Sequence, residues 1–339
     1  MTGRPDASGA DRDTALSVDS LTKRFGTRLA LDRLTLSVPR GAIHGFLGPN
    51  GAGKTTTFRL LTGLSRPESG TIRIFGQRVS FGSSAGRECI GYLPDVPDAY
   101  PFLRPMEFLD LCGRLGGLSH REIRTRSRAL LDLVGLPGET RRIGSFSRGM
   151  KQRLGLAQAI FHQPELVLLD EPVSALDPSG RKEILDLVGS LSRTATVFFS
   201  THILADVERV CDRVSILHEG RCLVDDTMAG LRARFPTQGI RVRVHVPVGS
   251  AHPPHPSVDP SGEPGCAPWL APLAALPDTT DWCDRARIVD DTTVDLTVRD
   301  RIRAGILLPR LLADTGISLD SFAPLEPSLE DIFLRVVTP

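Results

Sequence analysis

The motif FLGPNGAGKTTT, at residues 46–57, restricts the folds that this chain can adopt. The stretch has the spacing GxxxxGK[ST], follows the apolar run GAIHGFLG and precedes a helical pattern that begins at about Lys54. A glycine-rich loop between a buried strand and a helix turns successive backbone N–H groups toward phosphate oxygens, and the positive end of the helix dipole adds to the attraction. We therefore predict a phosphate-binding loop in which Lys54 reaches the terminal phosphates and Thr55 binds Mg²⁺. Its members are Gly48, Pro49, Asn50, Gly51, Ala52, Gly53, Lys54, Thr55 and Thr56.

The rest of the region up to about Phe235 alternates short apolar runs with segments of helical period. Such alternation predicts an α/β layer structure with a mostly parallel, buried sheet. We expect one large domain over residues 15–235, with a helical subdomain at about 97–160. The runs that read as strands are GAIHGFLG, TIRIFG, LVLLD, TVFFSTH and RVSILHEG.

The two ends of the chain differ from this pattern. Residues 1–14 are small, polar and charged, and we expect a disordered tail there. Residues 249–281 hold eight prolines between Pro253 and Pro277, which predicts a linker or extended insertion. The segments IRVRVHV before it and TVDLTV after it alternate like half-buried strands, and helical stretches follow at about 300–313 and from 328. We therefore expect a small accessory or regulatory α+β domain over residues 236–339.

Composition excludes several classes of function. The 41 Lys and Arg residues balance 40 Asp and Glu residues, so a formal charge of +1 gives no global field to attract nucleic acid, and we expect no nucleic-acid partner. The six cysteines form no CxxC pair, which argues against a disulfide framework and a zinc site. Without an apolar run of about 18 residues, the chain is not expected to cross a membrane by itself.

Acidic residues follow a second strand, in LVLLDEP at 166–172. An acidic pair there is by itself a common solvated strand end. Combined with the phosphate loop, it predicts the second half of a phosphate-hydrolysing site, in which Asp170 binds Mg²⁺ through water and Glu171 deprotonates the attacking water. His202, at the end of TVFFSTH, is placed to hydrogen-bond the γ-phosphate or that water, although a lone histidine at a strand end is more often structural.

A third motif, FSRGMKQRL at 146–154, opens a helix with a serine and a glycine. Ser147 can cap the helix, Gly149 leaves room for phosphate, and the free N–H groups of the first turn form a second anion site. Met150, Leu154, Ala157 and Ile160 form an apolar stripe, so the same helix also reads as an ordinary amphipathic one.

The order of these motifs over residues 16–235 resembles the ATP-binding cassette (ABC) ATPases. The resemblance implies ATP and Mg²⁺ as ligands, and a head-to-tail dimer in which Ser147, Arg148 and Gly149 of one copy close over the ATP of the other. It also implies that Phe25 stacks on adenine, although Phe25 could equally be a plain surface-strand residue. Asp177, in SALD, matches a loop that carries contacts across the dimer interface.

Two motifs depart from the family's commonest pattern. The signature reads Phe-Ser-Arg-Gly-Met in place of Leu-Ser-Gly-Gly-Gln, so that Arg148 and Met150 replace a glycine and a glutamine. Asp95, in GYLPDVP, replaces the glutamine that touches Mg²⁺ and the attacking water. Asp95 is shorter and charged, and we expect it to bind the metal through a water molecule.

The segment after Asp95, DVPDAYPFLRPMEFL, matches the part of transporter cassettes that faces the membrane partner. Its apolar Tyr100, Phe102 and Leu103 could seat a partner helix or could be ordinary core. The signature and the closing PSLEDIFLRV resemble the single-domain ATPases of type-two ABC exporters, the daunorubicin-resistance and multidrug-efflux group. The resemblance implies an ATPase on the cytoplasmic face of the membrane that powers a separate integral-membrane permease.

Two other functions remain open from the sequence. A soluble ABC protein acting on ribosomes or DNA usually carries two cassettes or a long coiled-coil insertion, and this chain shows neither heptads nor a second phosphate loop. A P-loop kinase would lack the signature and the strand-end histidine, so it would stay active when Ser147 is changed.

Overall fold

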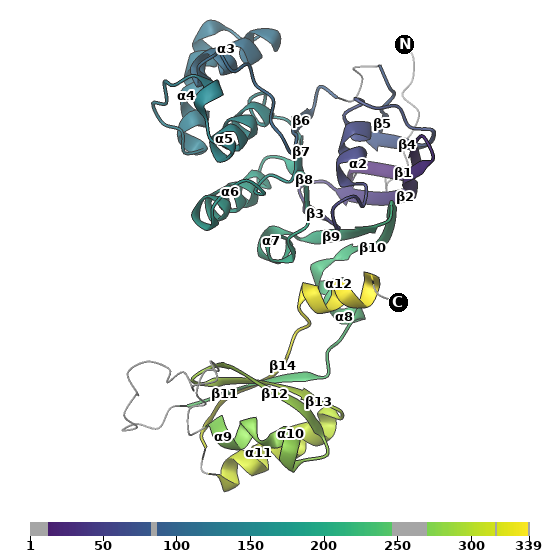
Figure 1. Ribbon diagram of the computed structural model, residues 1–339, viewed down its shortest axis with the longest axis vertical. Coiled ribbons are helices and arrows are strands. Elements are labelled where there is room, and N and C mark those ends of the chain that lie inside the picture. The colour runs from purple at the N-terminus through teal and green to yellow at the C-terminus, as the bar shows by residue number, and fades with distance from the viewer. Residues whose placement is uncertain (1–12, 83–86, 246–269, 316, 338–339) are drawn as a thin grey trace. The chain divides into compact units, whose positions relative to one another are not determined.

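The computed structural model describes residues 13–82, 87–245, 270–315 and 317–337. It separates into two compact units, shown in Figure 1. Unit 1 holds the described residues up to Leu231 and those from Leu329 onward, and unit 2 is Arg232–Ser328.

A six-stranded sheet forms the centre of unit 1, with the order β10-β9-β3-β8-β7-β6. All neighbouring pairs are parallel except β10 with β9. Every residue of the central strands β3, β7 and β8 is buried, because helices or a second sheet cover both faces, and such strands read as continuous apolar runs. The predicted parallel α/β core is therefore confirmed. The strands are β3 (Ile43–Leu47), β6 (Ile90–Leu93), β7 (Leu166–Asp170), β8 (Thr196–Thr201), β9 (Arg213–His218) and β10 (Arg221–Thr227).

A four-stranded antiparallel sheet, ordered β2-β1-β4-β5, packs beside this centre with helix α2. The predicted strand TIRIFG lies here, in β4, rather than in the parallel sheet. The rings of Phe46, Phe58 and Phe198 join the layers, with centroids 5.1–6.4 Å apart. The elements are β1 (Thr14–Phe25), β2 (Arg28–Pro39), α2 (Lys54–Leu61), β4 (Ser69–Ile74) and β5 (Gln77–Arg78).

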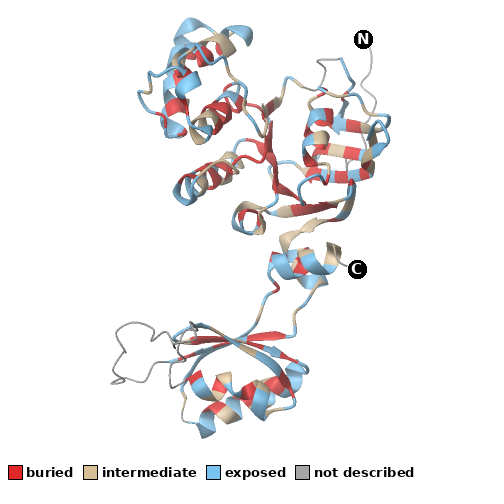
Figure 2. Cartoon of the chain, viewed as in Figure 1, coloured by how far each residue is buried: buried red, intermediate tan, exposed pale blue. Residues whose placement is uncertain are grey.

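Helices form the remainder of unit 1, and their buried faces turn inward in Figure 2. The predicted helical subdomain corresponds to α3, α4, η1 and α5, and α6 and α7 follow β7 and β8. Their bounds are α3 (Pro105–Leu115), α4 (His120–Leu133), η1 (Ile143–Ser145), α5 (Arg148–Ala159), α6 (Pro178–Leu191), α7 (Leu204–Val210) and α12 (Leu329–Val337). Helix α8 (Met228–Arg234) begins in unit 1 and ends in unit 2.

Unit 2 is a four-stranded antiparallel sheet, ordered β12-β13-β11-β14, with helices on one face. Ile240, Val242 and Val244 of β11 are buried and alternate with exposed arginines, as the sequence predicts for a half-buried strand. The elements are β11 (Gly239–Val244), α9 (Ala271–Ala274), α10 (Leu276–Thr279), β12 (Cys283–Asp290), β13 (Thr293–Val298), α11 (Arg301–Asp314) and β14 (Leu319–Pro324).

The N-terminal tail is shorter than expected. Thr14 already begins β1 and pairs with Pro39, because the apolar residues that follow it, Ala15 and Leu16, are fully buried. The rest of the predicted tail, residues 1–12, lies outside the described residues.

The expected insertion and C-terminal domain also have different bounds. Residues 249–269 lie outside the described residues, but α9 and α10 occupy 271–279 because Leu270, Leu273 and Leu276 recur at helical spacing and fill the core of unit 2. Helix α12 belongs to unit 1 rather than to the C-terminal unit. Its first residue, Leu329, is buried, and the backbone N–H of Leu329 donates to Glu208 Oε1 of α7 at 2.6 Å.

Candidate active site

The loop between β3 and α2 has a backbone that only glycine allows at two points. Gly53 has φ 112°, and a Cβ there would lie 2.7 Å from the Ala30 carbonyl oxygen. A Cβ on Gly48 would lie 2.4 Å from the Leu217 carbonyl oxygen. The chain therefore folds tightly before α2 begins at Lys54, as the phosphate-loop motif requires.

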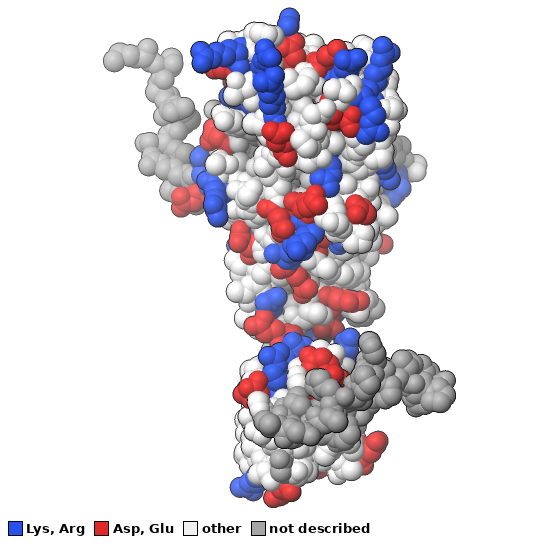
Figure 3. Space-filling view, turned by 90° about the vertical axis from the view of Figure 1, so that its left-hand side faces the viewer, with Lys and Arg blue, Asp and Glu red and all other residues white. Residues whose placement is uncertain are grey.

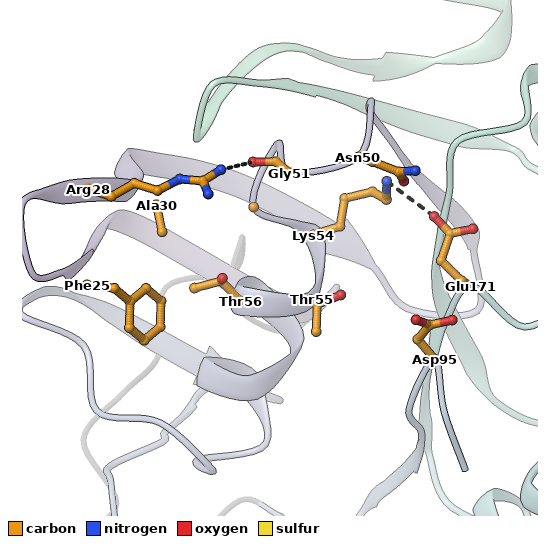
Figure 4. Close-up of a pocket in the computed structure, with 11 residues that line it drawn as sticks. Phe25, Arg28, Ala30, Asn50, Gly51, Lys54, Thr55, Thr56, Asp95 and Glu171 are labelled. Carbon is orange, nitrogen blue, oxygen red and sulfur yellow. Dashed lines mark hydrogen bonds and ion pairs between the residues drawn. The ribbon is translucent and has the colours of Figure 1, made fainter.

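Lys54 is only 6 % exposed, and its ammonium is held by oxygen atoms. Its Nζ donates to the carbonyl oxygens of Gly48 at 2.7 Å and Pro49 at 3.3 Å, and lies 3.2 Å from Glu171 Oε1. Figure 4 shows the Lys54 and Glu171 side chains meeting across the cleft. The loop thus directs a buried cation into the space where phosphate would bind.

Asp170 ends β7 and is completely buried. Ser200 Oγ donates to Asp170 Oδ1 at 2.6 Å, whereas Asp170 Oδ2 has no hydrogen-bond partner among the described residues. Burial raises the pKa of this carboxyl group, and the hydrogen bond from Ser200 and the nearby Thr55 hydroxyl oppose the rise. A buried carboxylate oxygen without a partner, beside a threonine hydroxyl, fits the oxygen ligands that Mg²⁺ prefers.

Glu171 is held from several sides. Its φ of 49° is a strained value for a residue other than glycine, and such strain is often found at functional sites. Glu171 Oε2 lies 3.0 Å from His202 Nδ1, so the strand-end histidine contacts the carboxylate predicted to act as base. The backbone of Glu171 is also tied down, because its N–H donates to Ser200 Oγ at 3.0 Å and its carbonyl accepts from Gln152 Nε2 at 3.3 Å.

Lys54 and Glu171 line a cleft of about 360 Å³, whereas the buried Asp170 does not. Phe25, predicted to contact adenine, is half exposed at one end, and Lys23 Nζ lies 5.1 Å from the centroid of its ring. Asp95 lies near Glu171 at the other end (Figure 4). The residues lining the cleft are Phe25, Arg28, Ala30, Asn50, Gly51, Gly53, Lys54, Thr55, Thr56, Asp95 and Glu171.

The signature residues do not line this cleft. Ser147 caps α5 as predicted, because Ser147 Oγ accepts from the backbone N–H of Met150 at 3.2 Å. Asp177 stands at the N-cap of α6. Neither these residues nor Arg148 and Gly149 are among those that line the cleft.

Sequence reasoning missed three residues that support the site. Ser200 stands opposite Asp170 in the parallel register of β7 and β8, so the motif LVLLD aligned with TVFFS could have indicated it. Gln152 and Arg28 had no such signal. Arg28 lines the cleft from β2, and its Nη2 donates to the Gly51 carbonyl oxygen at 3.4 Å.

Comparison with known proteins identifies the family. The family profile described as ABC transporter matches residues 31–174. The daunorubicin resistance ATP-binding protein DrrA3 of Streptomyces coeruleorubidus is 36 % identical over 326 residues, which cover 96 % of each chain. This chain belongs to the ABC transporter family. It is an ATP-binding subunit of that family and an ATPase, which confirms the predicted family and enzyme class and leaves the kinase alternative without support.

Solved structures agree with this assignment. A structure of the ATP-binding subunit of an ABC transporter has a TM-score of 0.60 at 35 % identity, and the match covers 66 % of this chain and 93 % of that one. A dimeric cassette in a post-hydrolysis state, bound to ADP and Pi, shares the fold with a TM-score of 0.58 at 24 % identity, over 63 % of this chain and 98 % of that one. Among the described residues, no helix is long and apolar enough to cross a bilayer.

Proposed function

We propose that this ATPase powers an ABC exporter, in which a separate integral-membrane permease carries a drug-like or lipid-like molecule. The observation that carries the proposal is the ion pair of Lys54 and Glu171 in a cleft beside the glycine loop, with the buried Asp170 next to Glu171 at the end of β7. The relative named for daunorubicin resistance supports export, because it matches this chain over nearly its full length.

The chain's own groups would hold ATP and Mg²⁺ as follows. The backbone N–H groups of the loop and Lys54 Nζ bind the phosphates, and Phe25 offers its ring to the base. Thr55 and the unpartnered Oδ2 of Asp170 would hold Mg²⁺, with Asp95 at the rim of the cleft. When bound, Mg²⁺ neutralises charge on the phosphate oxygens.

Glu171 is the group that takes a proton from the attacking water. Its two oxygens are fixed differently, one by Lys54 and the other by His202, so the carboxylate has a defined orientation. Its backbone bonds to Ser200 and Gln152 keep that orientation stable. We assign His202 the role of positioning Glu171, with its other ring nitrogen available toward the γ-phosphate.

The site is completed by a second copy of the chain. Ser147 and the first N–H groups of α5 form an anion site that does not line the chain's own cleft. In a head-to-tail dimer, this helix start would close over the ATP of the other copy, and Asp177 would lie at the same interface. ATP binding would then draw the copies together, and hydrolysis would release them.

An apolar patch on the loop after β6 is the proposed contact with the permease. Val96, Tyr100 and Phe102 are 67 %, 54 % and 61 % exposed, and the two rings lie 5.7 Å apart. Leu103, by contrast, is packed against the core of the helical subdomain, so only part of the predicted segment is free for a partner. Contact through this patch would place the ATPase at the cytoplasmic face of the membrane.

Affinity purification from detergent-solubilised host membranes tests this function. The Glu171→Gln chain, with ATP and Mg²⁺, should hold the closed state and retain a multi-span membrane protein. Adding Phe102→Asp should remove that protein, whereas Phe81→Asp, a change at another exposed phenylalanine (57 %), should not. Recovery of ribosomes or DNA instead would replace transport with the alternative function, for which the relatives give no support.

The charged side chains show no separation by sign on the face drawn in Figure 3, where basic and acidic residues are interspersed.

A further inference from the structure

Asp95 joins two motifs within one chain. Arg148 Nη2, at the start of α5, lies 3.5 Å from Asp95 Oδ1, and Ser174 Oγ lies 3.5 Å from the same oxygen. Asp95 also lines the cleft that holds Lys54 and Glu171. One carboxylate therefore links the chain's own ATP cleft to the signature helix, which lies outside that cleft.

The packing beneath this ion pair fixes its position. A Cβ on Gly149 would lie 3.0 Å from Leu176 Cδ2 and 3.4 Å from the Ala175 carbonyl oxygen, so the start of α5 packs against these two residues. Because the hydroxyl of the adjacent Ser174 reaches Asp95, the three groups converge through the fold rather than through long flexible side chains alone.

The pair depends on both departures from the commonest family pattern. A glycine in place of Arg148 would have no side chain, and a glutamine in place of Asp95 would have no charge. Only the combination present here gives a cation at the signature and an anion at the cleft, 3.5 Å apart.

We infer that Arg148 exchanges Asp95 for the γ-phosphate of the ATP bound by the other copy, and that this exchange couples the two ATP sites. The inference rests on the head-to-tail dimer proposed above. A guanidinium binds phosphate oxygens strongly, because its fork of N–H groups matches them and the phosphate carries more negative charge than a carboxylate. ATP in one site would thus draw Arg148 away and leave Asp95 free to turn toward the metal in its own site. Asp95 acts as a positioning residue in this step.

The exposure of the pair permits such an exchange. The side chains of Arg148 and Asp95 are 59 % and 42 % exposed, and partly exposed ion pairs are weak because water screens them. In the nucleotide-free chain the pair holds the Arg148 side chain at Asp95, and it is weak enough to be broken when Arg148 can bind a phosphate instead.

A double-mutant cycle in the Glu171→Gln chain tests the exchange. The quantity measured is the ATP concentration at half-maximal dimer formation, followed by analytical ultracentrifugation. Arg148→Gln is measured in two backgrounds, one with the native Asp95 and one with Asp95→Asn, and it should raise this concentration in both. The increase should be about two- to fivefold larger in the Asp95→Asn background, because only the native Asp95 competes with the phosphate for Arg148. A direct effect of position 95 on Mg²⁺ cancels in the comparison. Arg142→Gln, an exposed arginine close by in sequence, should act equally in both backgrounds.

Each other outcome overturns the inference. Equal effects of Arg148→Gln in the two backgrounds would mean that the pair stays intact when the dimer closes. A larger effect with native Asp95 would mean that the pair supports the closed dimer instead of competing with it. If the Glu171→Gln chain forms no ATP-dependent dimer at all, the proposed function fails, and the exchange fails with it. Dimerisation without coupling leaves the proposed function standing and removes only the exchange.

Discussion

Replacing Asp170 by asparagine should stabilise unit 1 without nucleotide and destroy its response to Mg²⁺ and ATP. Asp170 is fully buried with an unpartnered Oδ2, and burial raises the pKa of its carboxyl group above the ordinary value for aspartate. Asparagine keeps the shape and the acceptor for Ser200 while it removes the buried charge. The unpartnered oxygen of Asp170 carries charge, and burying a charged group without a partner costs more than the about 1–3 kcal/mol of a neutral one, so removing the charge should raise the free energy of unfolding at pH 7 by about 1–3 kcal/mol.

The gain should depend on pH in a defined direction. Because the folded pKa is raised, the native chain binds a proton more readily when folded than when unfolded. The penalty of the charge is complete above the folded pKa and is relieved as the pH falls through it. The difference between Asp170 and Asn at this position should therefore shrink as the pH is lowered from 7.

Hydrogen exchange at the amides of β7 and β8 is the appropriate assay, since both tryptophans belong to the sequence of unit 2 and would not follow unit 1. Asp132→Asn, at an exposed position of α4, should change the free energy of unfolding by less than about 0.5 kcal/mol. With ATP and Mg²⁺ the native chain should become more stable than Asp170→Asn, because only the native chain is stabilised by binding these ligands. Two results would refute this reasoning: a lower stability of Asp170→Asn than of the native chain at pH 7 without nucleotide, or a difference in the free energy of unfolding that does not shrink as the pH is lowered.

Three further predictions concern other parts of the site. Ser147→Ala should cost about 1 kcal/mol of stability through the lost helix cap, and should also abolish ATP-dependent dimerisation, which sedimentation would detect. Phe25→Leu should weaken ATP binding by roughly tenfold, measured by calorimetry, since base–aromatic stacking contributes about 1–3 kcal/mol. Burial lowers the pKa of His44 from 6.5 to about 3, so the native chain should lose stability as the pH falls from 6.5 toward 3, and His44→Asn should lose less in a urea titration at each pH.

The sequence predicted those parts of the fold that depend on local pattern. The buried strands before Gly48 and up to Asp170 were recognisable because parallel strands are apolar on both faces, and Ser147 was recognisable as a helix cap. The order of the motifs was enough to indicate the family, which the comparisons confirm.

Features that depend on tertiary contacts were not predictable in the same way. The return of α12 to unit 1 relies on buried Leu329 and its bond to Glu208, 121 residues away in the sequence. The short helices α9 and α10 were hidden by the prolines around them. Likewise, Asp95 and Arg148 were each recognised as departures from the family pattern. The two residues are 53 positions apart in the sequence, and their contact appears only in the folded chain.

Mixing two inactive variants is the most direct test of a site shared by two copies. Lys54→Ala disables the phosphate loop and Ser147→Arg blocks the signature, so each homodimer should be inactive. A mixed dimer would carry both defects in one site and leave the other site intact, and an equal mixture should recover up to about a quarter of the native ATPase rate. No recovery on mixing, or full activity in either variant alone, would contradict the claim that this ATPase completes its site with a second copy.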